Sequence, residues 1–159
     1  ALYYRSYGGA HFDAGWDDLV AGQSAGTRMP FAVMVDGTLV GMSSYIDIQR
    51  GNRALEIGTT YYRPSARGGP VNPAAKRLLL DHAFACGANR VAFKVDDRNG
   101  RSQAAMTKLG ATREGLLRHD MITWTGHVRS SVVFSILAED WPEIRARLDE
   151  RLAAFGVSS

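Results

Sequence analysis

Hydrophobic and polar positions follow two different periods along the chain, and each change of period marks the boundary of a predicted element. The first period is helical: apolar residues spaced three and four apart predict an amphipathic helix over residues 12–24. The residues that set this period are Phe12, Trp16, Leu19 and Val20. Glycines at positions 22 and 26 indicate where this helix ends.

A strand-like pattern follows the first helix. The β-like segments at 31–35 and 38–48 flank Asp36-Gly37, a dipeptide that readily adopts the positive φ angles of a tight hairpin. A third strand is predicted over residues 54–62, after a turn at Gly51-Asn52. The chain therefore predicts a meander of three strands.

Strands and helices alternate in the second half. Asn72 is a favourable N-cap and Pro73 suits the first helical position, so a helix is predicted from there to the stop at Gly87. The remaining predicted elements are a strand over 90–95, a short helix from Asn99 or Ser102 to Gly110, strands over about 119–124 and 128–137, and a final helix with a capping box at Asp140 and Glu143. This order predicts an α/β (α+β) fold with a mixed sheet flanked by helices.

Composition is consistent with one domain over residues 1–159, because 45% hydrophobic residues suffice for a core in a chain of this length. The 19 Lys+Arg against 16 Asp+Glu suit an anionic small molecule but lack the dense basic run of a strong nucleic-acid binder. No apolar run is long enough to cross a membrane. Four histidines and one cysteine show no metal-ligand spacing.

The lone cysteine, Cys86, cannot form an internal disulfide. It lies in an apolar helical stretch, so we expect a buried structural thiol in a protein of the reducing cytoplasm.

The segment YYRPSARGGPVNPAAKRLLLDHAF, residues 61–84, places an arginine and two glycines directly before a helix. A helix start leaves unpaired N–H groups and a partial positive charge, which favour a phosphate. Arg67 can add a forked donor, and Gly68 and Gly69 can turn successive N–H groups inward. The alternative is a plain connecting loop, because the segment matches neither the dinucleotide fingerprint nor the P-loop.

Three stretches in this order, LEIGTTYYRP, ARGGPVN and VAFKVDDRNGRSQAAMTKLGATREG, resemble the GCN5-related N-acetyltransferase (GNAT) family, especially its ribosomal-protein branch (RimJ/RimL-like). The resemblance runs from about residue 31 to residue 137. It implies an acyl-CoA N-acyltransferase-like fold with a mostly antiparallel sheet. It also implies transfer of the acetyl group of acetyl-CoA to a primary amine: a protein N-terminus, an amino acid or a small amine. The first strand and helix of the family fold are expected to be missing from this chain.

The resemblance also assigns residues. The strand before the glycine loop would pair with the pantetheine arm, and a backbone N–H near Thr60 would stabilise the oxyanion. The loop would wrap the pyrophosphate, although Pro70 and Asn72 depart from the family pattern and Pro70 has no N–H to donate. The implied cofactor-binding residues are Tyr61, Tyr62, Arg67, Gly68, Gly69, Val71, Asn72, Asn99, Arg101 and Ser102. For Asn99 and Ser102 the alternative is simple helix capping.

An attacking amine must lose a proton, and Glu56 is the first candidate base, because partial burial on its strand would raise its pKa. An outward-facing structural role is the alternative for Glu56, and His119 and Asp120 are other candidate bases. Family members often carry a tyrosine that protonates the leaving thiolate, and Met106 stands at that position.

Two other functions compete with an active transferase. Pro70 and Met106 are consistent with a non-catalytic acyl-CoA-binding module of the same fold. A nucleic-acid binder is disfavoured because the arginines are scattered. The resemblance implies that the hairpin around Trp124 lines the acceptor cleft or a dimer contact, and the alternative is a Trp in the core or flat on the surface. A homodimer is a further expectation.

Overall fold

The structure, a computed structural model, describes residues 11–156 and is organised around a six-stranded sheet. The strands are β1 (Met29–Val35), β2 (Thr38–Gln49), β3 (Ala54–Tyr62), β4 (Arg90–Asp96), β5 (Thr112–Ile122) and β6 (Val128–Leu137). Their order in the sheet is β1-β2-β3-β4-β6-β5. Only the pairing of β3 with β4 is parallel, so the expectation of a mixed, mostly antiparallel sheet is confirmed.

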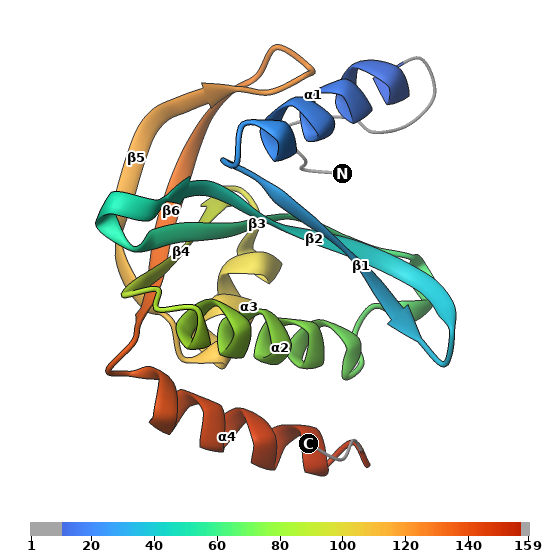
Figure 1. Cartoon of the computed structure of the whole chain (residues 1–159), viewed down its shortest axis with the longest axis vertical. Coiled ribbons are helices and arrows are strands. Elements are labelled where there is room, and N and C mark those ends of the chain that lie inside the picture. Colours follow the sequence, from blue (N-terminus) through green and yellow to red (C-terminus); the bar gives the residue numbers. More distant parts are fainter. Residues whose placement is uncertain (1–10, 157–159) are drawn as a thin grey trace.

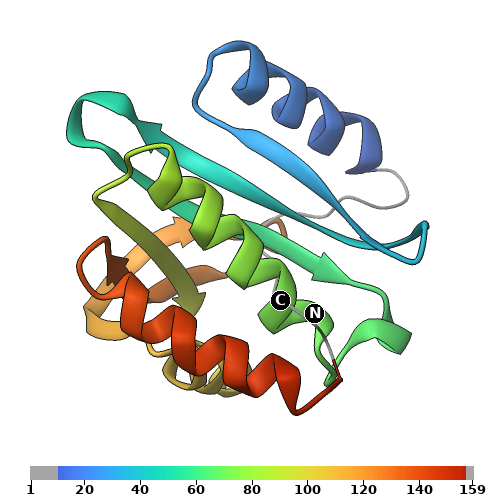
Figure 2. The same cartoon turned by 60° about the horizontal axis from the view of Figure 1, so that its bottom comes forward.

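Helices lie on both sides of this sheet, as Figures 1 and 2 show. They are α1 (Phe12–Ser24), α2 (Val71–Ala85), α3 (Gly100–Leu109) and α4 (Trp141–Ala153). α2, α3 and α4 share one side, whereas α1 lies on the other side beside β1 (Figure 1). The side that carries α2 is called the α2 face below, and the other is called the open face.

The core fills the α2 face. Val91 on β4, Ile136 on β6 and Leu80 on α2 are completely buried there. Alternation along β4 explains the packing, because Val91, Phe93 and Val95 point into the core while the residues between them point to the open face.

The predicted hairpin between β1 and β2 is confirmed. Asp36 and Gly37 have φ angles of 46° and 74°, the left-handed conformation that a two-residue turn requires. The turn places Val35 opposite Thr38, the first pair of the β1–β2 ladder.

A polar cluster fastens α4 to α2. The guanidinium of Arg77 pairs with Asp81 and, at 2.9 Å, with Asp149 of α4. The indole of Trp141 donates to Asp81 at 3.0 Å. α4 is therefore held by directed bonds as well as by its apolar stripe.

Four boundary or burial predictions are wrong. α2 begins at Val71 with Pro70 at the N-cap, because the fixed φ of Pro70 already suits a helix, so Asn72 is not the cap. Asp140 makes no side-chain cap and accepts from the N–H of Leu137 instead. β5 starts at Thr112, well before residue 119. Cys86 is exposed, because it is the C-cap residue, beyond the buried turns of α2.

Gly41 provides a test of the packing between β2 and β3. A Cβ there would lie 2.3 Å from the carbonyl oxygen of Tyr61 and 2.6 Å from Cδ1 of Tyr62. We expect Gly41→Ala to lower the free energy of unfolding by about 1–3 kcal/mol in urea denaturation, as overpacking does. Gly51→Ala is the matched control, since nothing lies within 4 Å of its Cβ position. Equal stability of the two variants would contradict the close approach.

Candidate active site

The strands β3 and β4 part soon after they meet. Their parallel pairing covers only Ala54–Glu56 opposite Arg90–Ala92, although β3 continues to Tyr62 and β4 continues to Asp96. Beyond Glu56 the facing edges of the two strands lack ladder partners. Backbone N–H and C=O groups at such an edge can bind an extended ligand.

Each parted strand leads to the start of a helix. Because β3 and β4 are parallel, their carboxyl ends lie at the same edge of the sheet, and the loops before α2 and α3 follow from that edge. Two helix starts with their partial positive charges therefore come together at the open end of the gap.

The loop before α2 leaves room for a ligand. Gly68 has a φ of +85°, a conformation that favours glycine, and no atom lies within 4 Å of the Cβ positions of Gly68 and Gly69. Val71 and Asn72 form the first helical residues and are half-buried. The predicted loop residues are thus contiguous around an unfilled helix start.

Arg67 holds this loop against β3. Its Nε donates to the carbonyl oxygen of Tyr62 at 2.8 Å, and its guanidinium lies over the ring of Tyr61, 5.4 Å from the centroid. Tyr62 is buried, and its hydroxyl has no partner. Burial raises the pKa of this phenol to about 12, so it stays protonated as a donor.

The start of α3 carries a side-chain helix cap, which was the alternative to a cofactor contact. The side chain of Asn99 accepts from the backbone N–H of Ser102 at 3.1 Å, so Asn99 is the helix cap. The roles of Asn99 and Ser102 toward the cofactor stay predictions. Arg101 is exposed in the first turn, where its guanidinium is open to solvent.

A bulge shapes β3 within the gap. Opposite the single residue Ser43 of β2, β3 carries both Thr59 and Thr60, and Thr59 has a φ of 50°. The hydroxyl of Thr60 lies 2.8 Å from the hydroxyl of Ser43 and accepts from Nζ of Lys76 at 3.0 Å. The bulge therefore directs Thr60 to the α2 face.

Lys76 is a buried cation at this point, with 4% of its surface exposed. Burial lowers the pKa of its amine to about 7, against a smaller raising effect of the Glu56 carboxylate. The ordinary value for a lysine is 10.5, so burial brings this amine into the range where it exchanges protons near neutrality.

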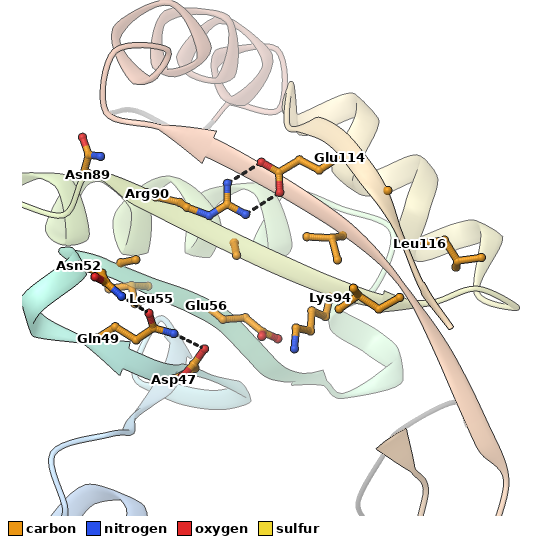
Figure 3. A pocket seen from close by; sticks show the side chains of 15 residues that line it. Asp47, Gln49, Asn52, Leu55, Glu56, Asn89, Arg90, Lys94, Glu114 and Leu116 are labelled. Carbon is orange, nitrogen blue, oxygen red and sulfur yellow. Dashed lines mark hydrogen bonds and ion pairs between the residues drawn. The ribbon is translucent and has the colours of Figure 1, made fainter. Parts of the chain in front are cut away.

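Glu56 occupies the open face at the point where the strands part. Burial raises the pKa of its carboxyl to about 7, and the neighbouring Lys94 counteracts this rise. Figure 3 shows the carboxylate of Glu56 pointing toward the amine of Lys94. The predicted effect of burial on this residue is therefore confirmed, while its role as a base stays a prediction.

A cleft of ≈600 Å³ adjoins Glu56 on the open face (Figure 3). Among its carboxylates, Glu114 is bound by Arg90, whose hydrogen bonds lower the pKa of Glu114 to about 2. Other residues on its walls are Asp47, Gln49, Asn52, Leu55, Asn89, Lys94 and Leu116. The cleft is thus polar, with an apolar wall supplied by β5.

Buried polar atoms without partners lie on strands around Glu56. Asp120 reaches Lys94 at 3.7 Å through one oxygen, but its Oδ2 has no partner. Nε of Arg129 and the hydroxyls of Ser44 and Ser131 are likewise unpartnered. Buried polar atoms are rarely left unpaired, so this face is suited to a polar ligand or ordered water.

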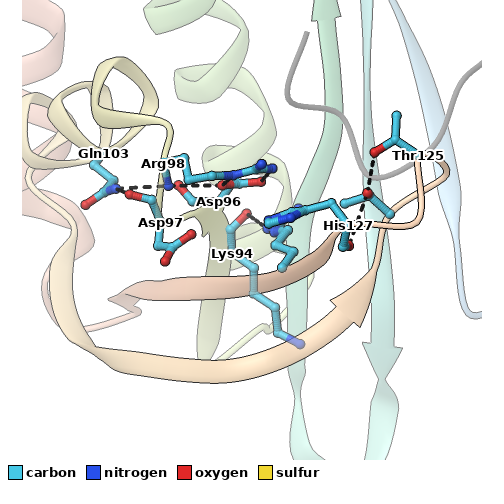
Figure 4. A network of polar contacts seen from close by, with 9 residues as sticks. Lys94, Asp96, Asp97, Arg98, Gln103, Thr125 and His127 are labelled. Carbon is cyan, nitrogen blue, oxygen red and sulfur yellow. Dashed lines mark hydrogen bonds and ion pairs between the residues drawn. The ribbon is translucent and has the colours of Figure 1, made fainter.

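A second polar network anchors the end of β4, as Figure 4 shows. Asp96 is buried and accepts two bonds from Arg98, at 2.9 and 2.8 Å, and these hydrogen bonds lower the pKa of its carboxyl. Gln103 donates to the carbonyl oxygen of Asp97 at 2.9 Å. The turn between β4 and α3 is thereby fixed.

Of the residues that the sequence singled out, His119, Met106 and Trp124 lie away from the gap or at its margin. His119 is exposed on β5, whereas its neighbour Asp120 joins the charges around Glu56. Met106 is buried in the core. The ring centroids of Trp124 and His11 lie 5.4 Å apart, so the hairpin between β5 and β6 packs against the start of α1.

Sequence reasoning missed Lys76. Its position has a recognisable signal, because Leu79, Leu80 and Ala83 follow it at the spacing of one helical face. A lysine on a face that is otherwise apolar is a candidate for a buried functional amine. Asp96 and Arg129 were also missed, and their burial depends on strand pairing that the sequence does not display.

Two absences concern the described part of the chain. No helix within residues 11–156 has the length and apolar character needed to cross a bilayer. The same residues contain no cluster of three or more histidine, cysteine or carboxylate side chains suited to a metal ion.

Comparison with known proteins assigns a family to this architecture. Residues 9–112 match the family described as "Acetyltransferase (GNAT) domain". YdaF of Bacillus subtilis (strain 168), provisionally named a ribosomal N-acetyltransferase, is 32% identical over 110 residues, which are 69% of this chain. The chain spans 59% of the length of that curated relative.

Solved structures agree with the sequence match. A provisionally named acetyltransferase from T. thermophilus is 40% identical with a TM-score of 0.81, and the match covers 89% of this chain and 74% of that one. RimJ of Mycobacterium smegmatis, solved in complex with CoA-disulfide, is 28% identical with a TM-score of 0.77, and the match covers 91% and 69% of the two chains. Because the family match spans more than half of the sequence and the fold is shared, this chain belongs to the GNAT acetyltransferase family.

Proposed function

We propose that this protein transfers the acetyl group of acetyl-CoA to a primary amine. The observation that carries the proposal is the gap between β3 and β4, which opens beside Glu56 and ends at the glycine loop before α2. An extended thiol cofactor with a pyrophosphate matches both features, since a strand edge suits its amides and a helix start suits its phosphates.

The residues present fit acetyl-CoA. Backbone N–H groups of Gly68, Gly69, Val71 and Asn72 would hold the pyrophosphate, and Pro70 contributes none. Tyr61 and Tyr62 would align the pantetheine arm along the edge of β3 that faces β4. Arg67 and Arg101 would face the phosphates, and Asn99 and Ser102 would act through the start of α3. When bound, the cofactor supplies an activated acetyl thioester.

The chemistry of the chain acts on a proton and on an oxyanion. The backbone N–H near Thr60, set by the bulge in β3, would stabilise the oxyanion that forms when the amine attacks. Glu56 would remove the proton of the amine, because a carboxyl with a pKa of about 7 is a base matched to neutral pH.

The acceptor amine would enter from the open face. The cleft beside Glu56 and the unpartnered atoms of Asp120 and Arg129 are suited to a polar amine. The hairpin that carries Trp124 and the start of α1 would form another wall. Protein N-termini, amino acids and small amines remain the acceptor classes to be compared.

We further propose that residues 1–159 act as one domain of a homodimeric cytoplasmic protein. β5 is an edge strand, and Ile122 near its end is exposed and lies outside the cleft lining, a surface that a second copy would cover. The lone exposed thiol of Cys86 is consistent with a reducing compartment.

The first test is calorimetric titration of acetyl-CoA, with Gly69→Val as the variant. We expect micromolar binding by the unaltered chain and a loss of affinity of at least about tenfold in the variant, or about 1.4 kcal/mol, since the added side chain would occupy the ligand's space. The temperature of unfolding should not change, because no protein atom lies within 4 Å of that Cβ position.

Gly51→Val is the control, because its Cβ position is equally open but lies far along the chain from the loop. It should bind as the unaltered protein does. Absence of acetyl-CoA binding would refute the transferase and the binding module together. Binding without thiol release on a panel of amines and N-terminal peptides would favour the non-catalytic module.

Glu56→Gln tests the base. At saturating amine, the kcat of the unaltered protein should rise with pH through a pKa of about 7, as Glu56 loses its proton. The variant should lose this rise and about 10²–10⁴-fold in kcat. Because both proteins are assayed with the same amine, ionisation of the acceptor contributes equally to both profiles.

The exposed Glu139 supplies the matched control, Glu139→Gln. Its profile should match that of the unaltered protein. If Glu56→Gln kept both the rise and the rate, Glu56 would be a structural residue and the base would have to be sought elsewhere, with Asp120 the next candidate.

A further inference from the structure

Lys76 spans the gap between the parted strands on the α2 face. Its Nζ lies 3.0 Å from the hydroxyl of Thr60 on β3 and 5.6 Å from the ring centroid of Phe93 on β4. Thr60 and Phe93 lie beyond the last residues that pair β3 with β4, so the amine is held where these two strands have parted.

This amine is held without a contacting carboxylate in the described residues. Its polar contact is the hydroxyl of Thr60, which itself bonds to the completely buried Ser43. Among titratable groups, Glu56 of β3 acts on Lys76 from the opposite face of the sheet. Burying a lysine in this way costs stability, so the arrangement calls for a functional reason.

Under the proposed function, the reaction needs a proton donor at the same gap. Attack by the amine forms the new C–N bond, and the C–S bond then breaks with its electron pair passing to sulfur. The thiolate so formed needs a positive charge or a proton. Met106 is buried in the core and has no proton to donate.

We propose that Lys76 is the acid of the reaction, donating a proton from Nζ to the departing CoA sulfur. Glu56 receives the proton that the attacking amine loses. One proton thus leaves the amine and one reaches the sulfur, so the products are the acetamide and the free thiol. Solvent then takes the proton from Glu56 and restores the proton of Lys76.

The placement of the two groups supports these roles. Glu56 faces the cleft from which the amine would enter, and Lys76 faces the side on which α2 and its phosphate loop lie. Burial moves both pKa values toward about 7 from opposite directions. A base and an acid of matched pKa on opposite sides of a reacting bond can exchange protons near neutral pH.

The first test measures the ionisation of the thiol of bound CoA rather than the rate of turnover. CoA is bound to the protein, and its thiolate is followed by ultraviolet absorbance against pH. We expect the bound thiol to titrate about 1–3 pH units below free CoA, because the thiolate and the protonated amine of Lys76 stabilise each other, and this shift should be lost in Lys76→Met. A bound thiol in the unaltered protein that titrates as free CoA does would overturn the proposal without any variant.

Kinetics and stability separate an acid from a structural lysine. Lys76→Met should lower kcat about 10²–10⁴-fold with an unchanged KM for acetyl-CoA. Its unfolding temperature at pH 7 should be no lower than that of the unaltered chain. The reason is that the pKa of Lys76 falls from 10.5 to about 7 on folding, so the lysine contributes a penalty that grows as pH falls through that window.

Lys76→Arg keeps the charge but holds its proton, so it should retain the shift of the bound thiol and still lose kcat. The exposed Lys108→Met is the control and should behave as the unaltered protein does. A Lys76→Met protein that loses CoA affinity and stability together would assign Lys76 a structural role and overturn the proposal. Absence of acetyl-CoA binding in the unaltered protein would instead refute the proposed function, whereas binding with unchanged kinetics in Lys76→Met would refute only the acid.

Discussion

The short pairing between β3 and β4 is the constraint on which the site depends. β3 stays bound to β2 through Tyr62, and β4 stays bound to β6 through Asp96, so each strand keeps its outer partner while the inner edges separate. A sheet that opens in its middle leaves backbone groups unpaired away from its rim. Two irregularities lie in the part of β3 that is not paired with β4. They are the bulge at Thr59 and Thr60 and the close approach of Gly41 to β3.

Groups that lower the stability of the fold lie at this opening, and groups that raise its stability lie elsewhere. Glu56 and Lys76 are ionisable and largely removed from water, and Tyr62 holds an unpartnered hydroxyl. The α2 face compensates with completely buried apolar side chains and with the cluster in which Arg77 joins α2 to α4. Stability is thus supplied by other parts of the fold than the one that carries the candidate site.

Local chemistry explains which elements could be predicted from the sequence. Asp36-Gly37 fixes its hairpin whatever surrounds it, and the spacing from Phe12 to Val20 suffices for α1. The start of β5 could not be predicted, since residues 112–118 form an edge strand exposed on most positions and carry no alternation. The start of α2 was misplaced because Pro70 suits an N-cap position less often than Asn72 does.

Of the candidate site, the sequence alone could locate only the contiguous glycine loop. The glycine loop is contiguous, so Arg67 to Asn72 could be located directly and is found together. Thr60 and Glu56 came from the family resemblance, and the burial of Glu56 agrees with the expectation. The burial of Lys76, Asp120 and Arg129 arises from contacts between distant strands and helices, which a single sequence does not reveal.

The separation of the two faces has a consequence for how such a protein changes over time. The α2 face carries the loop at Gly68, the buried lysine and the core, whereas the cleft beside Glu56 is bordered by β5, the Trp124 hairpin and the start of α1. Under the proposed function, substitutions on the open face would alter the acceptor without disturbing the core or the donor side. The division of this sheet would then allow acceptors to diversify under a constant donor.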